Sequence, residues 1–146
     1  MRVYEYRHTV GFEETNLVGN VYYVNHVRWQ GRVREMFLKE YAPEILQELE
    51  CGLSLATTRC SCEYLDEMRA FDQVLIRMSL AALSQNRITL HFEYFCDRKG
   101  TQKIMALGEQ QIACMRRQGD EFVPTAVPRA LRQALESFAP AVNSVP

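Results

Sequence analysis

Residues 24–41, VNHVRWQGRVREMFLKEY, decide the fold, because their apolar residues recur at the spacing of an α-helix. No proline interrupts this pattern before Pro43, so the sequence predicts one helix over residues 24–41. The runs before and after it are strand-like. One long helix among antiparallel strands is typical of an α+β domain.

This helix carries a cation on the side where apolar residues gather. At about 100° per residue, Arg34 falls between Val27 and Tyr41, within the apolar face. Burying a cation is costly unless a partner compensates it. Two interpretations of Arg34 are open. Its side chain can extend to the edge of the helix–sheet interface or pair with a structural carboxylate. Alternatively, it can line a pocket for an anion or a polarised carbonyl. The opposite, polar face comprises Asn25, Arg28, Arg32, Glu35 and Lys39.

Outward from the helix, both flanks are rich in β-forming residues. Before it, a predicted strand leads into the loop GFEETNLVGN, residues 11–20, which is rich in turn-forming residues. After it, Pro43 predicts the start of a second short helix. The predicted strands cover 2–10, 53–65, 73–84, 87–97 and 103–117, and the predicted shorter helices cover 43–51 and about 128–139.

These elements predict a single α+β domain in which a curved antiparallel sheet wraps around the 24–41 helix. The domain is expected over residues 1–140, with residues 141–146 as a flexible C-terminal tail. In the C-terminal helix, Leu131, Leu135 and Phe138 share one face, which we expect to pack on the core.

Composition excludes several classes of function. The 146 residues include 17 basic and 18 acidic ones, and a net charge of −1 argues against a nucleic-acid surface. No apolar run is long enough to span a membrane, and the N-terminus does not resemble a signal peptide. The five cysteines have no metal-binding spacing, so we expect buried thiols, no metal and a reducing cytoplasmic location.

The segment VGFEETNLVGNVYYVNHVRWQGRVREMFL, residues 10–38, resembles the hot-dog thioesterases of the 4-hydroxybenzoyl-CoA thioesterase type. In that family a loop with an Asp precedes a Gly and a V-Y-[FY] motif, which lead into the central helix. EYLDEMRAFDQVLI and EYFCDRKGTQKIMALGEQQIACM are similar to its later strands, so the resemblance covers nearly the whole chain. The matching positions are Thr15, Gly19, Val21, Tyr22, Tyr23, Asn25, Trp29, Arg34 and Glu35.

Within this family, the run NLVGNVYYVN is most similar to the thioesterases of enediyne polyketide biosynthesis, which also carry REMFL. The resemblance implies an enzyme of antibiotic biosynthesis. Such an enzyme hydrolyses an acyl thioester, here expected to be a β-keto polyene, from the carrier domain of an iterative polyketide synthase. The released acid can then lose carbon dioxide. No cofactor is implied.

Asn16 stands where the wider family has its catalytic Asp. An amide carries no titratable acceptor and cannot act as a general base. It can form a turn with its own backbone, or it can donate a hydrogen bond to a developing oxyanion. The resemblance favours catalytic roles for Asn16 and Arg34, acting on a thioester that is already activated by its β-keto group.

The resemblance also implies substrate-binding roles for Gly19, Tyr23, Asn25 and Glu35, although a surface ion pair is the stronger interpretation of Glu35. The phosphopantetheine arm and the carrier domain are the expected partners. A homodimer, expected to pair further into a homotetramer, could bring Asn16 of one chain near Arg34 of the other. Two alternatives stay open: a general acyl-CoA thioesterase, and an acyl-binding module without catalysis.

Overall fold

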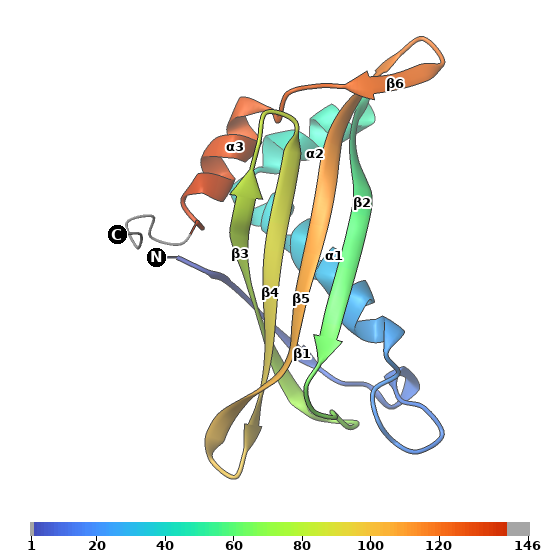
Figure 1. Ribbon diagram of the computed structural model, residues 1–146, viewed down its shortest axis with the longest axis vertical. Coiled ribbons are helices and arrows are strands. Elements are labelled where there is room, and N and C mark those ends of the chain that lie inside the picture. The colour runs from blue at the N-terminus through green and yellow to red at the C-terminus, as the bar shows by residue number, and fades with distance from the viewer. Residues whose placement is uncertain (1, 140–146) are drawn as a thin grey trace.

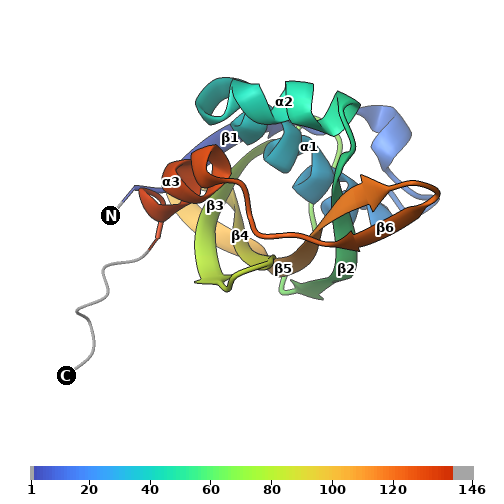
Figure 2. The same cartoon turned by 90° about the horizontal axis from the view of Figure 1, so that it is seen from above.

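The computed structural model describes residues 2–139, and in it a curved antiparallel sheet wraps around one long helix (Figures 1 and 2). This confirms the predicted α+β hot-dog architecture. The predicted tail over residues 141–146 lies outside the described residues. In chain order the elements are β1 (Tyr4–Thr9), a 3₁₀ turn (Phe12–Glu14), α1 (Val24–Tyr41), α2 (Pro43–Glu50), β2 (Leu53–Tyr64), β3 (Gln73–Leu83), β4 (Arg87–Arg98), β5 (Thr101–Gln118), β6 (Glu121–Pro124) and α3 (Arg129–Glu136).

The strands lie in the order β1-β3-β4-β5-β2, each antiparallel to its neighbour, and β6 pairs with the end of β5. The strand β6 was not predicted. It is a four-residue return after a turn at Gly119, where the backbone has a φ of +66°. Because β2 forms an edge of the sheet, one side of this strand has no partner within the described residues.

The helix α1 begins and ends where the sequence predicts. It ends where the amide of Ala42 donates to the carbonyl of Leu38 at 2.9 Å, and Pro43 then starts α2. Its inner face buries Val33, Phe37 and Leu38 against the sheet. Viewed from above, α1 lies between the curved sheet and α2 (Figure 2).

The strand β4 supplies much of the core because it alternates strictly. Its buried side chains are those of Ile88, Leu90, Phe92, Tyr94 and Cys96, and the residues between them are only partly buried. A two-residue turn joins β4 to β5, with positive φ at Lys99 (57°) and Gly100 (80°). Such a turn matches the right-handed twist of the two strands.

The C-terminal helix α3 closes one end of the core. Leu131, Leu135 and Phe138 are all buried, as the sequence predicts. The ring of Phe138, two residues after the end of α3, packs edge-on against Phe37 of α1, with ring centroids 5.1 Å apart, and against Tyr4 of β1 at 6.5 Å. These contacts tie α3 to the first strand and the central helix.

The prediction that the thiols are buried was wrong for three of the five cysteines, of which Cys62 is half-buried. Cys96 and Cys114 are buried, whereas Cys51 and Cys60 are exposed, because Cys51 ends α2 and Cys60 lies on the edge strand β2. Within residues 2–139, no group of His, Cys, Asp and Glu side chains could hold a metal ion. No helix of this part of the chain is long and apolar enough to cross a membrane.

Candidate active site

The loop that precedes α1 is organised by the side chain of Asn16. Its Oδ1 accepts hydrogen bonds from the backbone amides of Val18 and Asn20, both at 3.1 Å. The backbone amide of Asn16 donates to the carbonyl of Asn20 at 2.8 Å, and Thr15 bridges to Val21 across the base of the loop. The side-chain oxygen of Asn16 therefore stabilises the turn of its own loop, which is one of the two roles considered for this residue.

The amide nitrogen of Asn16 is not used in this way. Within residues 2–139, Nδ2 makes no hydrogen bond, and the side chain is exposed. Asn16 lines an open groove of about 1040 Å³ together with Tyr22, Asn25 and Arg28. The loop thus fixes the amide through its oxygen and leaves its two N–H donors available to a ligand in the groove.

Gly19 and Tyr23 shape the approach to the start of α1. Gly19 has a φ of +87°, a left-handed conformation that favours glycine, and this lets the loop turn back toward the helix. Tyr23 is the residue before the first turn of α1, and its ring is exposed. Its carbonyl accepts a hydrogen bond from the hydroxyl of Tyr64 at 2.8 Å, which ties the helix start to β2.

Asn25 is buried, although the helical projection places it on the polar face. Its Nδ2 donates to the backbone carbonyl of Glu14 at 2.8 Å. The chain that enters the helix covers the side of the first turn that carries Asn25, whereas Val24 in the same turn is exposed. Asn25 holds the loop against the helix and still lines the groove beside Asn16.

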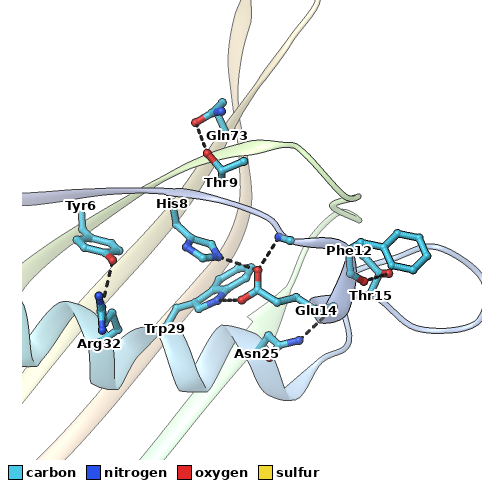
Figure 3. Close-up of polar contacts among 11 residues, drawn as sticks. Tyr6, His8, Thr9, Phe12, Glu14, Thr15, Asn25, Trp29, Arg32 and Gln73 are labelled. Carbon is cyan, nitrogen blue, oxygen red and sulfur yellow. Dashed lines mark hydrogen bonds and ion pairs between the residues drawn. The ribbon is translucent and has the colours of Figure 1, made fainter.

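Glu14 is the centre of a polar cluster that the sequence did not predict (Figure 3). Its Oε1 accepts from the backbone amide of Gly11 and from His8 Nε2, and its Oε2 accepts from Trp29 Nε1, all at 2.8 Å. Burial alone would raise the pKa of the Glu14 carboxyl group. The hydrogen bonds from Gly11, Trp29 and His8 outweigh burial, so the net pKa is lowered.

Arg34 lies between α1 and the sheet, where its partners are neutral. Its Nη1 donates to Gln110 Oε1 on β5 at 2.9 Å and to Thr57 Oγ1 on β2 at 3.1 Å. Its Nε is buried without a hydrogen-bond partner in the described chain. Burial lowers the pKa of Arg34, and the negative charge of the adjacent Glu35 opposes this shift. The guanidinium group is a partly desolvated cation that forms no ion pair with a carboxylate within residues 2–139.

A small apolar cavity of about 10 Å³ adjoins Arg34. Arg34 is the one charged residue of its lining. The rest is contributed by α1, α3 and the sheet, through Phe37, Leu38, Leu55, Met78, Ile88, Leu90, Ile112, Leu131 and Leu135. A cation in the lining of an otherwise apolar cavity suits a ligand with a polar head and an apolar tail.

A single chain does not bring Asn16 and Arg34 together. Asn16 lines the open groove beside the start of α1, whereas Arg34 lines the apolar cavity under the middle of the helix. Glu35 is exposed and lines a third groove with His8, Glu14 and Arg32. Gly19, Tyr23 and Asn25 stay with Asn16, so the predicted site residues fall into separate places on one protomer.

His26 is the histidine closest in sequence to this site, and it is buried. Burial lowers its pKa to about 4, although a hydrogen bond to the backbone of Tyr23 opposes this shift. The imidazole is therefore neutral near pH 7. Its Nδ1 has no hydrogen-bond partner in the described residues.

Comparison with protein families identifies one match. The Thioesterase-like superfamily matches residues 10–135, which include the loop, α1 and all the strands after them. No curated protein sequence matches the chain.

Solved structures are similar over almost the full chain. The dynemicin thioesterase, whose study describes induced-fit and allosteric effects upon polyene binding, is 42% identical, with a TM-score of 0.92 over 97% of this chain and 100% of that one. A 4-hydroxybenzoyl CoA thioesterase variant in complex with 4-hydroxybenzoyl CoA is 14% identical. Its TM-score is 0.82, and the match covers 92% of this chain and 99% of that one. A 1,4-dihydroxy-2-naphthoyl-CoA thioesterase from Synechocystis is 15% identical. Its TM-score is 0.80, and the match covers 92% of this chain and 96% of that one. The last two, at such low identity, show the fold alone.

Proposed function

Because this chain belongs to the Thioesterase-like superfamily, we propose that it releases a β-keto, polyene-type acyl chain from the carrier domain of an iterative enediyne polyketide synthase. The chain is a thioester hydrolase with the hot-dog fold. The similarity to the dynemicin thioesterase, which binds a polyene, supports the narrower substrate class. The proposed substrate implies a role in antibiotic biosynthesis.

The observation that carries the proposal is the setting of Arg34. Its guanidinium meets a neutral amide and a hydroxyl, Gln110 and Thr57, and faces an apolar cavity. A cation without a carboxylate partner retains its attraction for an oxygen of the substrate. The β-keto oxygen suits Arg34, and the apolar lining suits the polyene chain beyond it.

Asn16 supplies the second element of the proposed reaction. Water attacks the thioester carbonyl, the C–S bond breaks, and the departing sulfur takes the proton that the water loses. The N–H donors of Asn16 stabilise the oxyanion that forms, and one such donor contributes about 3 kcal/mol to the transition state. The β-keto group makes the thioester carbonyl more electrophilic, so the reaction proceeds without a carboxylate base at position 16.

The separation of Asn16 from Arg34 within one protomer supports an assembly in which two chains complete the site. The edge strand β2 carries Thr57, which holds Arg34, so a second chain paired along this edge would lie close to the guanidinium. Edge strands of this length are usually covered. We propose a homodimer in which the Asn16 loop of one chain serves Arg34 of the other, and a homotetramer of two such dimers.

The proposed substrate also requires the protein to move. A cavity of about 10 Å³ holds roughly one water molecule, far less than an acyl chain. α1 or α3 must therefore shift away from the sheet to admit the chain. Ligand-dependent rearrangement of this kind agrees with the induced fit described for the dynemicin thioesterase.

The test is mass spectrometry of a synthase carrier domain loaded with a β-ketoacyl chain, incubated with this protein, against acyl-CoA controls. We expect loss of the acyl group from the carrier and appearance of the free acid or its decarboxylated ketone. Unchanged loading would identify an acyl-binding module without catalysis. Equal turnover of simple acyl-CoA esters would identify a general acyl-CoA thioesterase.

A further inference from the structure

We propose that Glu14 is a positioning residue that holds the Asn16 loop against the start of α1 through its ionised carboxylate. The inference rests on the proposed role of Asn16 as an oxyanion donor. Glu14 does not line the groove that contains Asn16. Its contribution to hydrolysis would come from where it places the loop.

The carboxylate of Glu14 joins separate parts of the fold (Figure 3). It accepts hydrogen bonds from His8 of β1, from the amide of Gly11 at the start of the loop, and from Trp29 on the second turn of α1. The side chain of Glu14 is only 14% exposed, so these bonds are largely shielded from water. Shielding makes each bond stronger and makes loss of any partner more costly.

The backbone of Glu14 binds α1 and the residues just before it. Its carbonyl accepts from Asn25 Nδ2 at 2.8 Å and from the amide of Tyr22 at 2.9 Å. Thr15, the next residue, is held by its hydroxyl, which donates to the carbonyl of Phe12 at 2.7 Å. Asn16 follows Thr15 directly. Only Thr15 therefore separates Asn16 from Glu14, which is anchored by both its side chain and its backbone.

This arrangement requires an ionised carboxylate rather than any polar side chain. The groups that meet the Glu14 carboxylate are the Gly11 amide, the Trp29 indole and His8, and the first two can only donate. A glutamine in this place would turn an NH₂ group toward at least one of these donors. The loop would lose an anchor, and the neighbouring donor would be left buried without an acceptor.

The loop itself gives a direct readout. We would compare Glu14→Gln with Glu13→Gln, which removes the exposed neighbouring carboxylate, by hydrogen–deuterium exchange of the amides of residues 15–21. Glu14→Gln should accelerate exchange at Val18 and Asn20, whose amides bind Asn16 Oδ1, and Glu13→Gln should not. Trp29 is the single tryptophan of the chain, so its fluorescence should also shift in Glu14→Gln alone.

Kinetics test the connection to the reaction. Glu14→Gln should lower kcat about tenfold or more, because displaced catalytic groups cost about that much, and should leave KM nearly unchanged. In the Asn16→Ala background the same substitution should have no further effect on kcat. Trp29→Phe, which removes one donor and keeps an aromatic ring, should reproduce the loss in part and shows whether the effect survives in a second folded variant.

The outcomes separate the two proposals. Unchanged loop exchange in Glu14→Gln, or an equal loss of kcat with and without Asn16, would overturn the positioning role of Glu14. Full activity of Asn16→Ala would instead overturn the proposed function of Asn16, whatever the exchange shows. Thermal unfolding of each variant identifies any that has failed to fold.

Discussion

Arg34 Nη1 donates to Gln110 Oε1 at 2.9 Å, so the nearest polar partner of this half-buried cation is a neutral amide on β5. Gln110 is itself only 4% exposed. An amide satisfies the geometry of the guanidinium without neutralising its charge. The distinction between an amide and a carboxylate at position 110 should therefore decide how strongly Arg34 attracts a substrate oxygen.

We predict that Gln110→Glu lowers hydrolysis of a β-ketoacyl thioester about tenfold or more, because the new carboxylate forms a charge-assisted hydrogen bond with Arg34 and competes with the substrate. The melting temperature should not fall, since the change provides an ionic partner for a half-buried cation. Steady-state kinetics and thermal unfolding measure both effects. Gln102→Glu, on an exposed part of the same strand, is the charge-matched control and should leave kcat unchanged.

For Asn16, we predict that Asn16→Asp retains the loop and lowers kcat. A carboxylate can still accept the amides of Val18 and Asn20, but it has lost the N–H donors. Loss of one oxyanion donor corresponds to a decrease of about 100-fold. Hydrogen exchange should report an intact loop while single-turnover hydrolysis reports the loss. A kcat equal to or above that of the unmodified protein would show that these donors are not used.

The Glu14 cluster predicts a stability that falls in acid. The folded-state pKa of Glu14 lies below its usual value of 4.5, so the cluster stabilises the fold fully above about pH 4.5. That contribution is lost as the pH falls from there through the lower, folded-state pKa. Denaturant unfolding between pH 7 and pH 3 should show a steeper decline for the unmodified protein than for Glu14→Gln.

We predict that alanine substitutions at two glycines, Gly108 and Gly31, change the stability of the fold in opposite directions. A methyl group at Gly108 on β5 would meet Gln30 Nε2 and lie 3.2 Å from the carbonyl of Ser61. Gly108→Ala should destabilise the fold by about 1–3 kcal/mol, as overpacking in a core does. A methyl group at Gly31 on α1 would meet nothing within 4 Å, so Gly31→Ala should stabilise the helix by up to about 1 kcal/mol. Chemical denaturation of the two variants measures both.

If two chains complete the site, activity should depend on protein concentration. Sedimentation velocity should detect the proposed homodimer or homotetramer. Specific activity should fall on dilution in step with dissociation, because a separated chain keeps Asn16 and Arg34 in different cavities. Constant specific activity across dissociation would show instead that one chain is sufficient.

Most of the fold could be predicted from local sequence signals. The apolar period and Pro43 set the bounds of α1, and the positions of Leu131, Leu135 and Phe138 set the buried face of the last helix. The strand β6 escaped prediction because its four residues form only as a return along β5. The exposed thiol of Cys60 on β2 escaped prediction because the sequence does not show which strand lies at the edge.

The site was harder to predict because its geometry depends on contacts between distant residues. Arg34 could be singled out as a candidate because a cation interrupts an apolar face, a pattern visible in one helix. Glu14 stands next to Glu13, and nothing local distinguishes a carboxylate held by His8 and Trp29 from one in water. Asn25 was predicted to lie on the polar face of the helix but is buried, because the preceding loop, and not the sheet, packs over it.

The narrowness of the cavity beside Arg34 has a consequence for selectivity among acyl chains. If the acyl group enters this cavity as proposed, it must separate packed side chains before it gains any contact with them. A short chain then bears this cost and recovers little from burial. Chain length then acts as a threshold rather than a graded preference. The tendency of these side chains to repack would also favour release of the acid after the thioester is cleaved, because repacking displaces the acyl chain from the cavity.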